Sequence, residues 1–262
     1  MSQFSSHAAR LGALACALFA LATPSALAAD RYVALGDSFA SGVGTGSYTL
    51  SSSCKRSVYA YPYLVAQQRP NTALDFVACS GATTSSLMAS QIAAVNAATT
   101  LVTVTIGGND IRFADLIVQC TVSDCSSSLD STRASLPTFL PPRLDSVYTA
   151  IRSQAAFGAR IGVLGYPRMF GSAGCLGTLG ISTTERTKAN QLADALDQTI
   201  AARAAAFGFS YASAVVPFTG HAVCSSGPWL NGLNLFNSTE SYHPNRNGHA
   251  LGYVPLARSV VG

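Results

Sequence analysis

The chain has 262 residues, of which 48% are hydrophobic and only 11% are charged, and its formal net charge is +4. Its basic residues are scattered along the chain, which argues against a nucleic-acid-binding protein, because such proteins gather Lys and Arg into a patch or stripe. The length and the low charge favour one compact domain with a sizeable core.

Residues 1–28 have the pattern of a secretory signal peptide. Arg10 precedes an apolar run at residues 11–21, and small residues form a cleavage site at residues 26–28. The apolar run is shorter than the roughly 20 residues of a transmembrane helix, which favours cleavage over an uncleaved membrane anchor. Removing 28 of the 262 residues leaves 234 with a net charge of +3. We expect residues 29–262 to be secreted as a single extracellular domain.

Short apolar runs alternate with segments of helical spacing along the mature chain. The apolar runs predict five strands, at residues 31–35, 73–78, 101–106, 161–164 and 209–215. The other segments predict helices at residues 58–68, 85–98, 131–156 (interrupted or started near two prolines), 183–207 and 245–260. This alternation indicates βαβ units and a parallel sheet covered on both faces. Residues 112–131 and 165–181 are expected to be irregular loops that build a pocket.

Three short polar motifs follow predicted strands, and a fourth lies near the C-terminus. They are Gly36-Asp37-Ser38, Ser80-Gly81-Ala82, Gly107-Gly108-Asn109-Asp110 and His243-Pro244. Each alone also suits an ordinary turn or helix cap. Because parallel strands end at one edge of the sheet, where ligands bind, the first three are expected to converge there.

Together these motifs resemble those of the GDSL/SGNH hydrolase superfamily, and in particular its secreted actinobacterial lipase and esterase branch. The resemblance runs from Tyr32 to about Leu251. It implies a flavodoxin-like, three-layer α/β/α fold with a parallel five-stranded sheet in the order 2-1-3-4-5. It also implies a carboxylic ester hydrolase of the lipase, esterase or phospholipase A type, which needs no cofactor and no metal.

The resemblance further implies a role for each matching residue. Ser38 is the nucleophile and His243 the general base, while Gly81, Asn109 and the Ser38 N–H are oxyanion donors. The residue types suit this chemistry, because a histidine with a pKa near ~6.5 can accept the serine proton at neutral pH. Glycine lets a backbone N–H approach closely, and an Asn amide adds a fixed donor.

The group that orients His243 is left open by the sequence. The family usually has Asp three residues before the histidine, and Glu240 stands at that place here. The alternatives are the Glu240 carboxylate, a backbone carbonyl from Ser241 or a neighbour, or a remote acid. Asp37 and Asp110 are interpreted as structural, and His249 is a less favoured alternative base.

Cysteine usage supports export. Cys16 lies in the signal peptide, and the other six cysteines form an even set that favours disulfides in an exported chain. Sequence alone does not choose the pairing; we favour neighbours in sequence order, which are Cys54–Cys79, Cys120–Cys125 and Cys175–Cys224. No Cys-x-x-Cys pair indicates zinc or redox chemistry.

The substrate is predicted from apolar loops near the expected site. Residues 218–236, with Phe218, Trp229 and Phe236, either line an acyl groove or fill the core, and apolar residues within 112–140 form a candidate facing wall. We expect a small-molecule or lipid ester as substrate, transient contact with lipid surfaces, and a monomer. The rival interpretations are a carbohydrate-directed acetyl esterase and a non-catalytic binding protein of the same fold.

Overall fold

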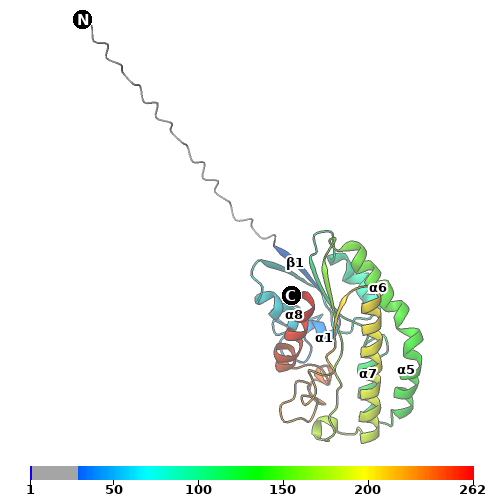
Figure 1. The fold of residues 1–262 in the computed structure, drawn as a ribbon. Coiled ribbons are helices and arrows are strands. Elements are labelled where there is room, and N and C mark those ends of the chain that lie inside the picture. Colours follow the sequence, from blue (N-terminus) through cyan, green and yellow to red (C-terminus); the bar gives the residue numbers. More distant parts are fainter. Residues whose placement is uncertain (2–28) are drawn as a thin grey trace.

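The computed structural model describes residue 1 and residues 29–262, so the expected signal peptide, apart from residue 1, lies outside the described residues. A five-stranded parallel sheet forms the centre of the molecule, in the order β2-β1-β3-β4-β5 (Figure 1). Its strands are β1 (Asp30–Gly36), β2 (Thr72–Phe76), β3 (Leu101–Thr105), β4 (Arg160–Leu164) and β5 (Ser210–Ala212). The strand order is the one that the resemblance implied.

Helices cover both faces of the sheet. They are α1 (Ser38–Ser41), α2 (Tyr61–Gln67), α3 (Thr84–Ser90), α4 (Phe113–Cys120), α5 (Ser126–Phe139), α6 (Pro141–Gln154), α7 (Thr183–Ala206) and α8 (Val254–Val261). Helices α2 and α8 pack on one face, α3, α6 and α7 lie on the other side, and α5 runs along α7 (Figure 1). The expected three-layer α/β/α architecture is confirmed.

The apolar sequence runs explain the buried strands. Residues 32–35 of β1 and all five residues of β3 are buried, as expected for central parallel strands with helices on both faces. Helix α7 begins at a capping box, in which the Ser182 hydroxyl accepts from the Glu185 N–H while the Glu185 carboxylate accepts from the Ser182 N–H. The core thus holds β1 and β3, whose carboxyl ends carry the first and third motifs.

One predicted loop differs from the structure. Residues 112–131 are not an irregular loop but contain α4 and the start of α5, because Phe113, Ile117 and Cys120 have helical spacing and bury one face. The predicted break in the helix at residues 131–156 is confirmed, since α5 ends at Phe139 and the two prolines after Leu140 begin α6.

The remaining short elements are the 3-10 turns η1 (Ile92–Ala94), η2 (Leu176–Thr178) and η3 (Ser238–Glu240) and the π-helical segment η4 (Gly248–Tyr253). Among the residues that the structure describes, none of the helices combines the length and apolar content of a membrane span.

Candidate active site

Ser38 lies where β1 ends and the short helix α1 begins. The φ angle of Gly36 is +135°, and a Cβ there would lie 2.4 Å from the carbonyl oxygen of Thr105, so only glycine allows this turn beside β3. Asp37 caps α1 by accepting a 2.9 Å hydrogen bond from the Phe39 N–H. Ser38 therefore sits at the carboxyl edge of the sheet, only 7% exposed.

His243 reaches Ser38 from an irregular loop near the C-terminus. An antiparallel bridge pairs Leu230 with Pro244, and the Asn231 N–H donates to the His243 carbonyl oxygen at 2.9 Å. These contacts hold the loop so that the imidazole Nε2 lies 2.8 Å from the Ser38 Oγ. The fold thus brings together two residues that are 205 positions apart in the sequence.

The second ring nitrogen of His243 determines its protonation pattern. Nδ1 lies 2.8 Å from the backbone carbonyl oxygen of Ser241. A carbonyl oxygen can only accept, so Nδ1 carries the proton. The lone pair of Nε2 is then free to accept the hydrogen bond of the Ser38 hydroxyl. This tautomer is the one that a general base for Ser38 requires.

Glu240 does not contact the imidazole, which corrects its prediction as the orienting group. Its Oε1 instead accepts a 2.5 Å hydrogen bond from the Tyr48 hydroxyl. The physical reason is that Glu240 ends the turn η3, and Ser241 leaves this turn in an extended conformation with ψ of 138°. The carbonyl of Ser241 thereby takes the place facing Nδ1, which is the second of the three alternatives.

The site keeps His243 neutral. Burial lowers the pKa of His243 to about 4, and the hydrogen bond to the Ser241 carbonyl opposes this shift only in part. Above that pH the ring is unprotonated at Nε2. It can therefore accept a proton from Ser38 over the whole neutral range.

The three expected oxyanion donors each retain an N–H without a protein acceptor. Among the described residues, the backbone N–H groups of Ser38 and Gly81 have no hydrogen-bond acceptor. Asn109 donates one N–H of its amide to the Ala82 carbonyl oxygen at 3.0 Å, which leaves the other one free. Ser38, Asn109 and His243 line one hollow, whereas Gly81 is not among its lining residues.

Both aspartates of the motifs are engaged in structural hydrogen bonds. The buried Asp37 accepts from the hydroxyl of Tyr166, which in turn accepts from the Gly108 N–H at 3.1 Å. Burial raises the pKa of Asp37 to about 7, against the opposing effect of the Tyr166 hydrogen bond. Asp110 accepts 2.9 Å and 2.5 Å bonds from the N–H and hydroxyl of Thr84, the first residue of α3.

The other histidines do not reach Ser38. The Nδ1 of His249 accepts from the backbone N–H of Tyr61 at 3.3 Å, and burial lowers the pKa of His249 to about 3. His221 stacks on Trp229 with ring centroids 3.8 Å apart. Of the described histidines, His243 alone is within hydrogen-bond reach of the serine.

Three residues outside the four motifs also shape the site. The side-chain amide of Gln91 donates to the Gly36 carbonyl oxygen at 2.9 Å and accepts from the Gly36 N–H at 2.8 Å, which clamps the end of β1. The amide of Asn231 donates to the Gly44 carbonyl oxygen at 2.9 Å. Tyr166 holds Asp37. None of the three belongs to a sequence motif. Only Tyr166 has a sequence signal for a place near the site, because it comes just after a predicted strand.

The hollow beside Ser38 has mostly apolar walls. They include Phe39, Phe113, Ala114, Ile117, Met169 and Tyr242. Phe113 and Ile117 belong to α4, so part of the expected facing wall is present. Of the apolar residues at 218–236, Phe218 and Leu230 are buried in the core, whereas Leu233 and Phe236 line a separate surface hollow.

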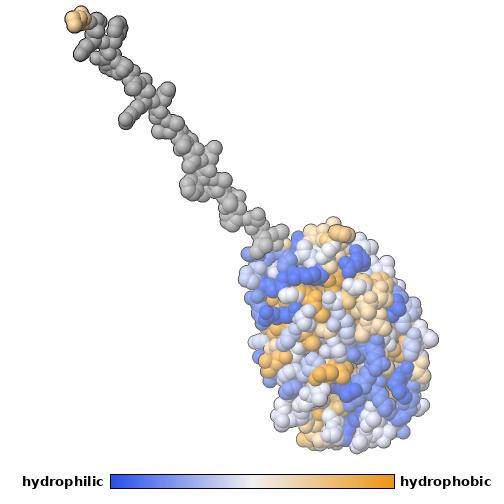
Figure 2. Space-filling view, in the orientation of Figure 1, coloured by the Kyte–Doolittle hydropathy of each residue, from blue (hydrophilic) through white to orange (hydrophobic). Residues whose placement is uncertain are grey.

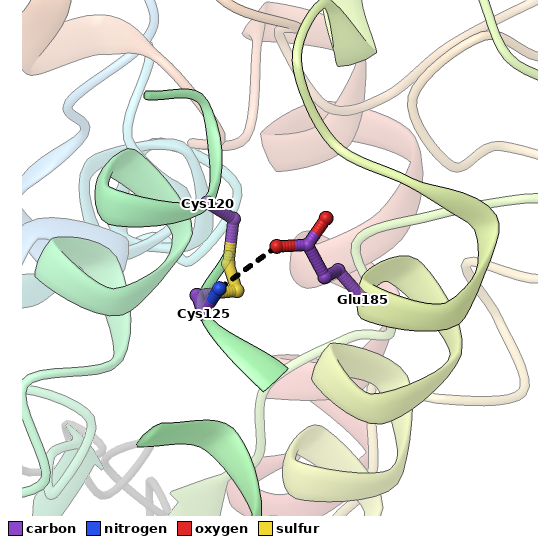
Figure 3. A group of neighbouring side chains, drawn as sticks. All are labelled: Cys120, Cys125 and Glu185. Carbon is purple, nitrogen blue, oxygen red and sulfur yellow. Dashed lines mark hydrogen bonds between the residues drawn. A yellow bond between two sulfur atoms is a disulfide. The ribbon is translucent and has the colours of Figure 1, made fainter. Parts of the chain in front are cut away.

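One group of side chains among the described residues has the arrangement of metal ligands, namely Cys120, Cys125 and Glu185. Figure 3 shows the carboxylate of Glu185 turned toward the disulfide that joins the two cysteines. The Oε1 atom of Glu185 accepts a 2.9 Å hydrogen bond from the Cys125 N–H, and Oε2 accepts two from Ser182. Since both sulfurs are bonded to each other, this group fastens α7 to the loop between α4 and α5.

Three disulfides connect the loops around the site. They are Cys54–Cys79, Cys120–Cys125 and Cys175–Cys224, the pairs favoured from sequence order. The first ties the loop after α1 to the segment that leads to Gly81. The third ties the 165–181 loop to the segment that precedes His243.

Known proteins are similar to this chain in sequence and in fold. Residues 34–251 match the model of the GDSL-like Lipase/Acylhydrolase family. The chain is similar to "Lipase 1" of Streptomyces coelicolor, with 44% identity over 240 residues that cover 89% of this chain and 88% of the relative.

Two solved structures are similar over nearly the same region. One is an extracellular lipase from Streptomyces rimosus, with a TM-score of 0.84 and 43% identity, covering 88% of this chain and all of that one. The other is a phospholipase A1 from Streptomyces albidoflavus NA297, also with a TM-score of 0.84 and 43% identity, covering 89% of this chain and all of that one.

Proposed function

Since this chain belongs to the GDSL-like lipase/acylhydrolase family and is a carboxylic ester hydrolase, we propose that it cleaves lipid acyl esters through an acyl-enzyme on Ser38. The observation that carries the proposal is the 2.8 Å contact between the Ser38 Oγ and the His243 Nε2. Nδ1 of the same ring is protonated and bonded to the Ser241 carbonyl. A nucleophile, a base and a group that orients the base are thus in reach of one another.

The reaction proceeds in two halves. In the first, Ser38 attacks the ester carbonyl carbon while Nε2 of His243 takes the hydroxyl proton and then gives it to the leaving alcohol. In the second, water loses a proton to Nε2 and attacks the acyl-serine, which releases the carboxylic acid and restores Ser38. The Ser241 carbonyl holds the ring in place and stabilises the imidazolium, a role that a carboxylate has in many serine hydrolases.

The negative oxygen of each tetrahedral intermediate needs donors that are not already engaged. The N–H groups of Ser38 and Gly81 and the second amide N–H of Asn109 supply them. Because these donors are fixed by the fold beforehand, little reorganisation is needed during the reaction. The N-terminal end of α1 adds a favourable potential for the anion.

An acyl substrate suits the surroundings of the site. The walls of the catalytic hollow are apolar, and two neighbouring loops expose Leu176, Leu179, Leu235 and Phe236. These loops lie side by side, since the Leu233 N–H donates to the Gly177 carbonyl oxygen at 2.9 Å. Figure 2 shows hydrophobic residues reaching the surface at the lower end of the molecule, where Figure 1 places the loops of the carboxyl edge. Such a rim favours transient contact with a lipid surface.

The biological setting follows from the same features. Residues 1–28 act as a cleaved signal peptide, and residues 29–262 form one secreted domain. Three disulfides and the extracellular Streptomyces rimosus relative support this setting. The proposed catalytic groups all come from a single chain, so a monomer suffices for activity.

A covalent probe tests the nucleophile. A fluorophosphonate should label the folded, oxidised protein at Ser38, with labelling lost in Ser38→Ala and strongly slowed in His243→Ala. Asp110→Asn is a matched control beside the site and should still be labelled. An unreactive Ser38 in folded wild-type protein contradicts the proposal and favours a non-catalytic binding protein.

A chain-length series tests the substrate class. For p-nitrophenyl esters, kcat/KM should rise from the acetyl to medium and long acyl chains, because a longer chain buries more apolar surface in the hollow. A preference for acetyl esters would instead support the carbohydrate-directed acetyl esterase.

A further inference from the structure

A second hollow lies beside the catalytic one and has a different chemical character. It has a volume of ≈ 330 Å³ and is lined by polar side chains of α7 and of residues 168–172, among them Arg168, Arg186 and Asp194. Residues 168–170 separate the two hollows, since Met169 lines the catalytic one and Phe170 the second. A single water occupies about 30 Å³ of liquid, so the second hollow has room for a small hydrated ion.

Arg186 in this hollow carries a charge that no acid balances. Its side chain is largely buried, with the residue 8% exposed, and its Nε has no hydrogen-bond partner. Nη1 and Nη2 donate only to the neutral hydroxyls of Thr178 and Thr183, at 3.4 Å and 3.0 Å. None of the ion pairs among the described residues includes Arg186.

The nearest acid in sequence is not available to Arg186. Glu185 is fully engaged with the backbone of Cys125 and with Ser182. A buried cation without a partner is costly, and an anion that enters the hollow would relieve this cost. Arg186 is therefore a buried cation without an acidic partner at the wall of the hollow, and this is the observation that points to an anionic ligand.

The rest of the hollow adds a second, fixed guanidinium. Arg168 is held in a forked pair by Asp194, with Nε–Oδ1 and Nη2–Oδ2 distances of 2.7 Å and 2.8 Å. Because Asp194 neutralises Arg168, the charge of Arg186 leaves the lining with a net charge of +1. The N-terminal turn of the 24-residue helix α7 contributes Thr183 and the positive end of its dipole.

We propose that this hollow binds an oxyanion, a phosphate or phosphodiester group, through the guanidinium of Arg186 with Arg168 at its rim. Two sources carry this chemistry, the headgroup phosphate of a lipid and free inorganic phosphate. The first rests on the proposed function, because the shared wall at Met169 and Phe170 would place the headgroup beside the acyl site. The second is independent of catalysis.

Calorimetric titration with sodium phosphate, against sodium chloride of equal ionic strength, tests binding directly. Wild type and Ser38→Ala should both bind one phosphate saturably. Arg186→Met should lose about tenfold or more in affinity, since charge-assisted hydrogen bonds are lost. Arg168→Gln replaces a half-exposed side chain outside the core, and it should also weaken phosphate binding. Arg133→Gln in α5 removes the same charge elsewhere and should bind as wild type.

Thermal melts show whether each variant is folded. Phosphate should raise the Tm of wild type and of Arg133→Gln, but not of Arg186→Met. Absence of saturable binding in wild type, or equal affinity in wild type, Arg186→Met and Arg168→Gln, overturns the proposal. Because Ser38→Ala is included, this outcome is independent of whether the protein hydrolyses esters.

Kinetics on matched substrates identify the source of the anion. Phosphatidylglycerol and diacylglycerol with the same acyl chains are compared in mixed micelles of one neutral detergent. A KM that rises about tenfold in Arg186→Met for the phospholipid alone assigns the site to the headgroup. Unchanged KM values, together with lost phosphate binding, assign it to free phosphate.

Discussion

Ser38 and His243 are held by two different kinds of structure. Ser38 follows β1, which pairs along its length with β2 and β3, and the Gln91 amide clamps the last residue of the strand. His243 lies in a loop without regular secondary structure and is held by separate contacts, such as those of Asn231 and the Ser241 carbonyl. The proposed nucleophile is held by the sheet, whereas the proposed base is held by a few individual hydrogen bonds.

The sheet side and the loop side of the site should therefore respond differently to substitution. Removing one bond in the sheet region leaves many others in place, so a substitution there should act on the chemistry alone. Removing one tie of the His243 loop changes both the position of the base and the order of the loop. Paired variants test that contrast.

The largest effect is expected at Asn109, on the sheet side. Asn109→Ala removes a proposed oxyanion donor and should lower kcat by about 10² to 10³. Its hydrogen bond to Ala82 is a single contact beside the sheet, so the Tm should change little. Ester hydrolysis under saturating substrate and a thermal melt measure the two effects.

The control for Asn109→Ala is its neighbour. Asp110→Asn keeps an acceptor for Thr84 and should leave kcat within about threefold of wild type, since Asp110 does not face the reaction. An equal loss of kcat in both variants would mean that the loop as a whole, and not the Asn109 amide, matters.

Removal of the two disulfides should have unequal effects on stability and activity. Cys175–Cys224 joins residues 49 apart and Cys120–Cys125 joins residues only 5 apart. The chain-entropy model gives about 4 kcal/mol of stabilisation for the longer loop and about 2 kcal/mol for the shorter one. C175A/C224A should therefore lower the Tm more than C120A/C125A. It should also lower activity, because it frees the segment before His243.

Thermal melts and ester hydrolysis measure the Tm and the activity of both disulfide variants. Full reduction of wild type should lower the Tm and activity together. Activity that survives verified loss of Cys175–Cys224 would show that the hydrogen bonds of the His243 loop suffice to position the base.

Acid should weaken the fold through its buried histidines. Burial lowers the pKa of His249 to about 3 and that of His243 to about 4, from 6.5. Below pH 6.5 the unfolded chain therefore binds more protons than the folded one, and the free energy of unfolding falls as pH falls toward 4. The raised pKa of Asp37, about 7 against 3.8, acts in the opposite direction over this whole range and offsets the contribution of about one histidine.

Comparing wild type with a His249 variant isolates the contribution of this histidine to the pH dependence of stability. His249→Phe should flatten the loss of stability between about pH 6.5 and 4.5 by on the order of 2 kcal/mol, because that group no longer titrates. Equal slopes in wild type and His249→Phe in urea melts would contradict the assigned burial effect. Catalysis should persist to lower pH than an ordinary histidine allows, since His243 stays neutral.

The sequence predicts the sheet side of the molecule better than the loop side. Continuous apolar runs dictate buried strands, and Ser38 follows such a run, so its place at the sheet edge was predictable. The segment at residues 112–131 was misjudged, because the helical spacing of Phe113 and Ile117 was hidden among cysteines and polar residues. Gln91 and Asn231 are not predictable from the sequence, because they act through tertiary hydrogen bonds that leave no local pattern. Tyr166 has only a weak signal, its place just after a predicted strand.

Glu240 shows the same limit within a single motif. The spacing to His243 indicates that Glu240 is near, but the direction of a loop side chain depends on what it meets in the fold. Here the Tyr48 hydroxyl donates to the Glu240 carboxylate, and the Asn231 amide donates to the Glu240 backbone carbonyl at 3.3 Å. Motif spacing alone could not separate these outcomes.

The smallest expected effect is therefore that of Glu240→Gln. The amide oxygen can still accept from Tyr48, and the Ser241 carbonyl still holds Nδ1 of His243, so kcat should stay within about threefold of wild type. Removing a carboxylate that orients a catalytic histidine costs about 10⁴ elsewhere. The matched variant Tyr48→Phe breaks the same tie from the other side and should have a similarly small effect on kcat at 25 °C. A loss of a thousandfold or more in Glu240→Gln alone would return the orienting role to the carboxylate, and the base would then depend on a charge and not on a backbone carbonyl.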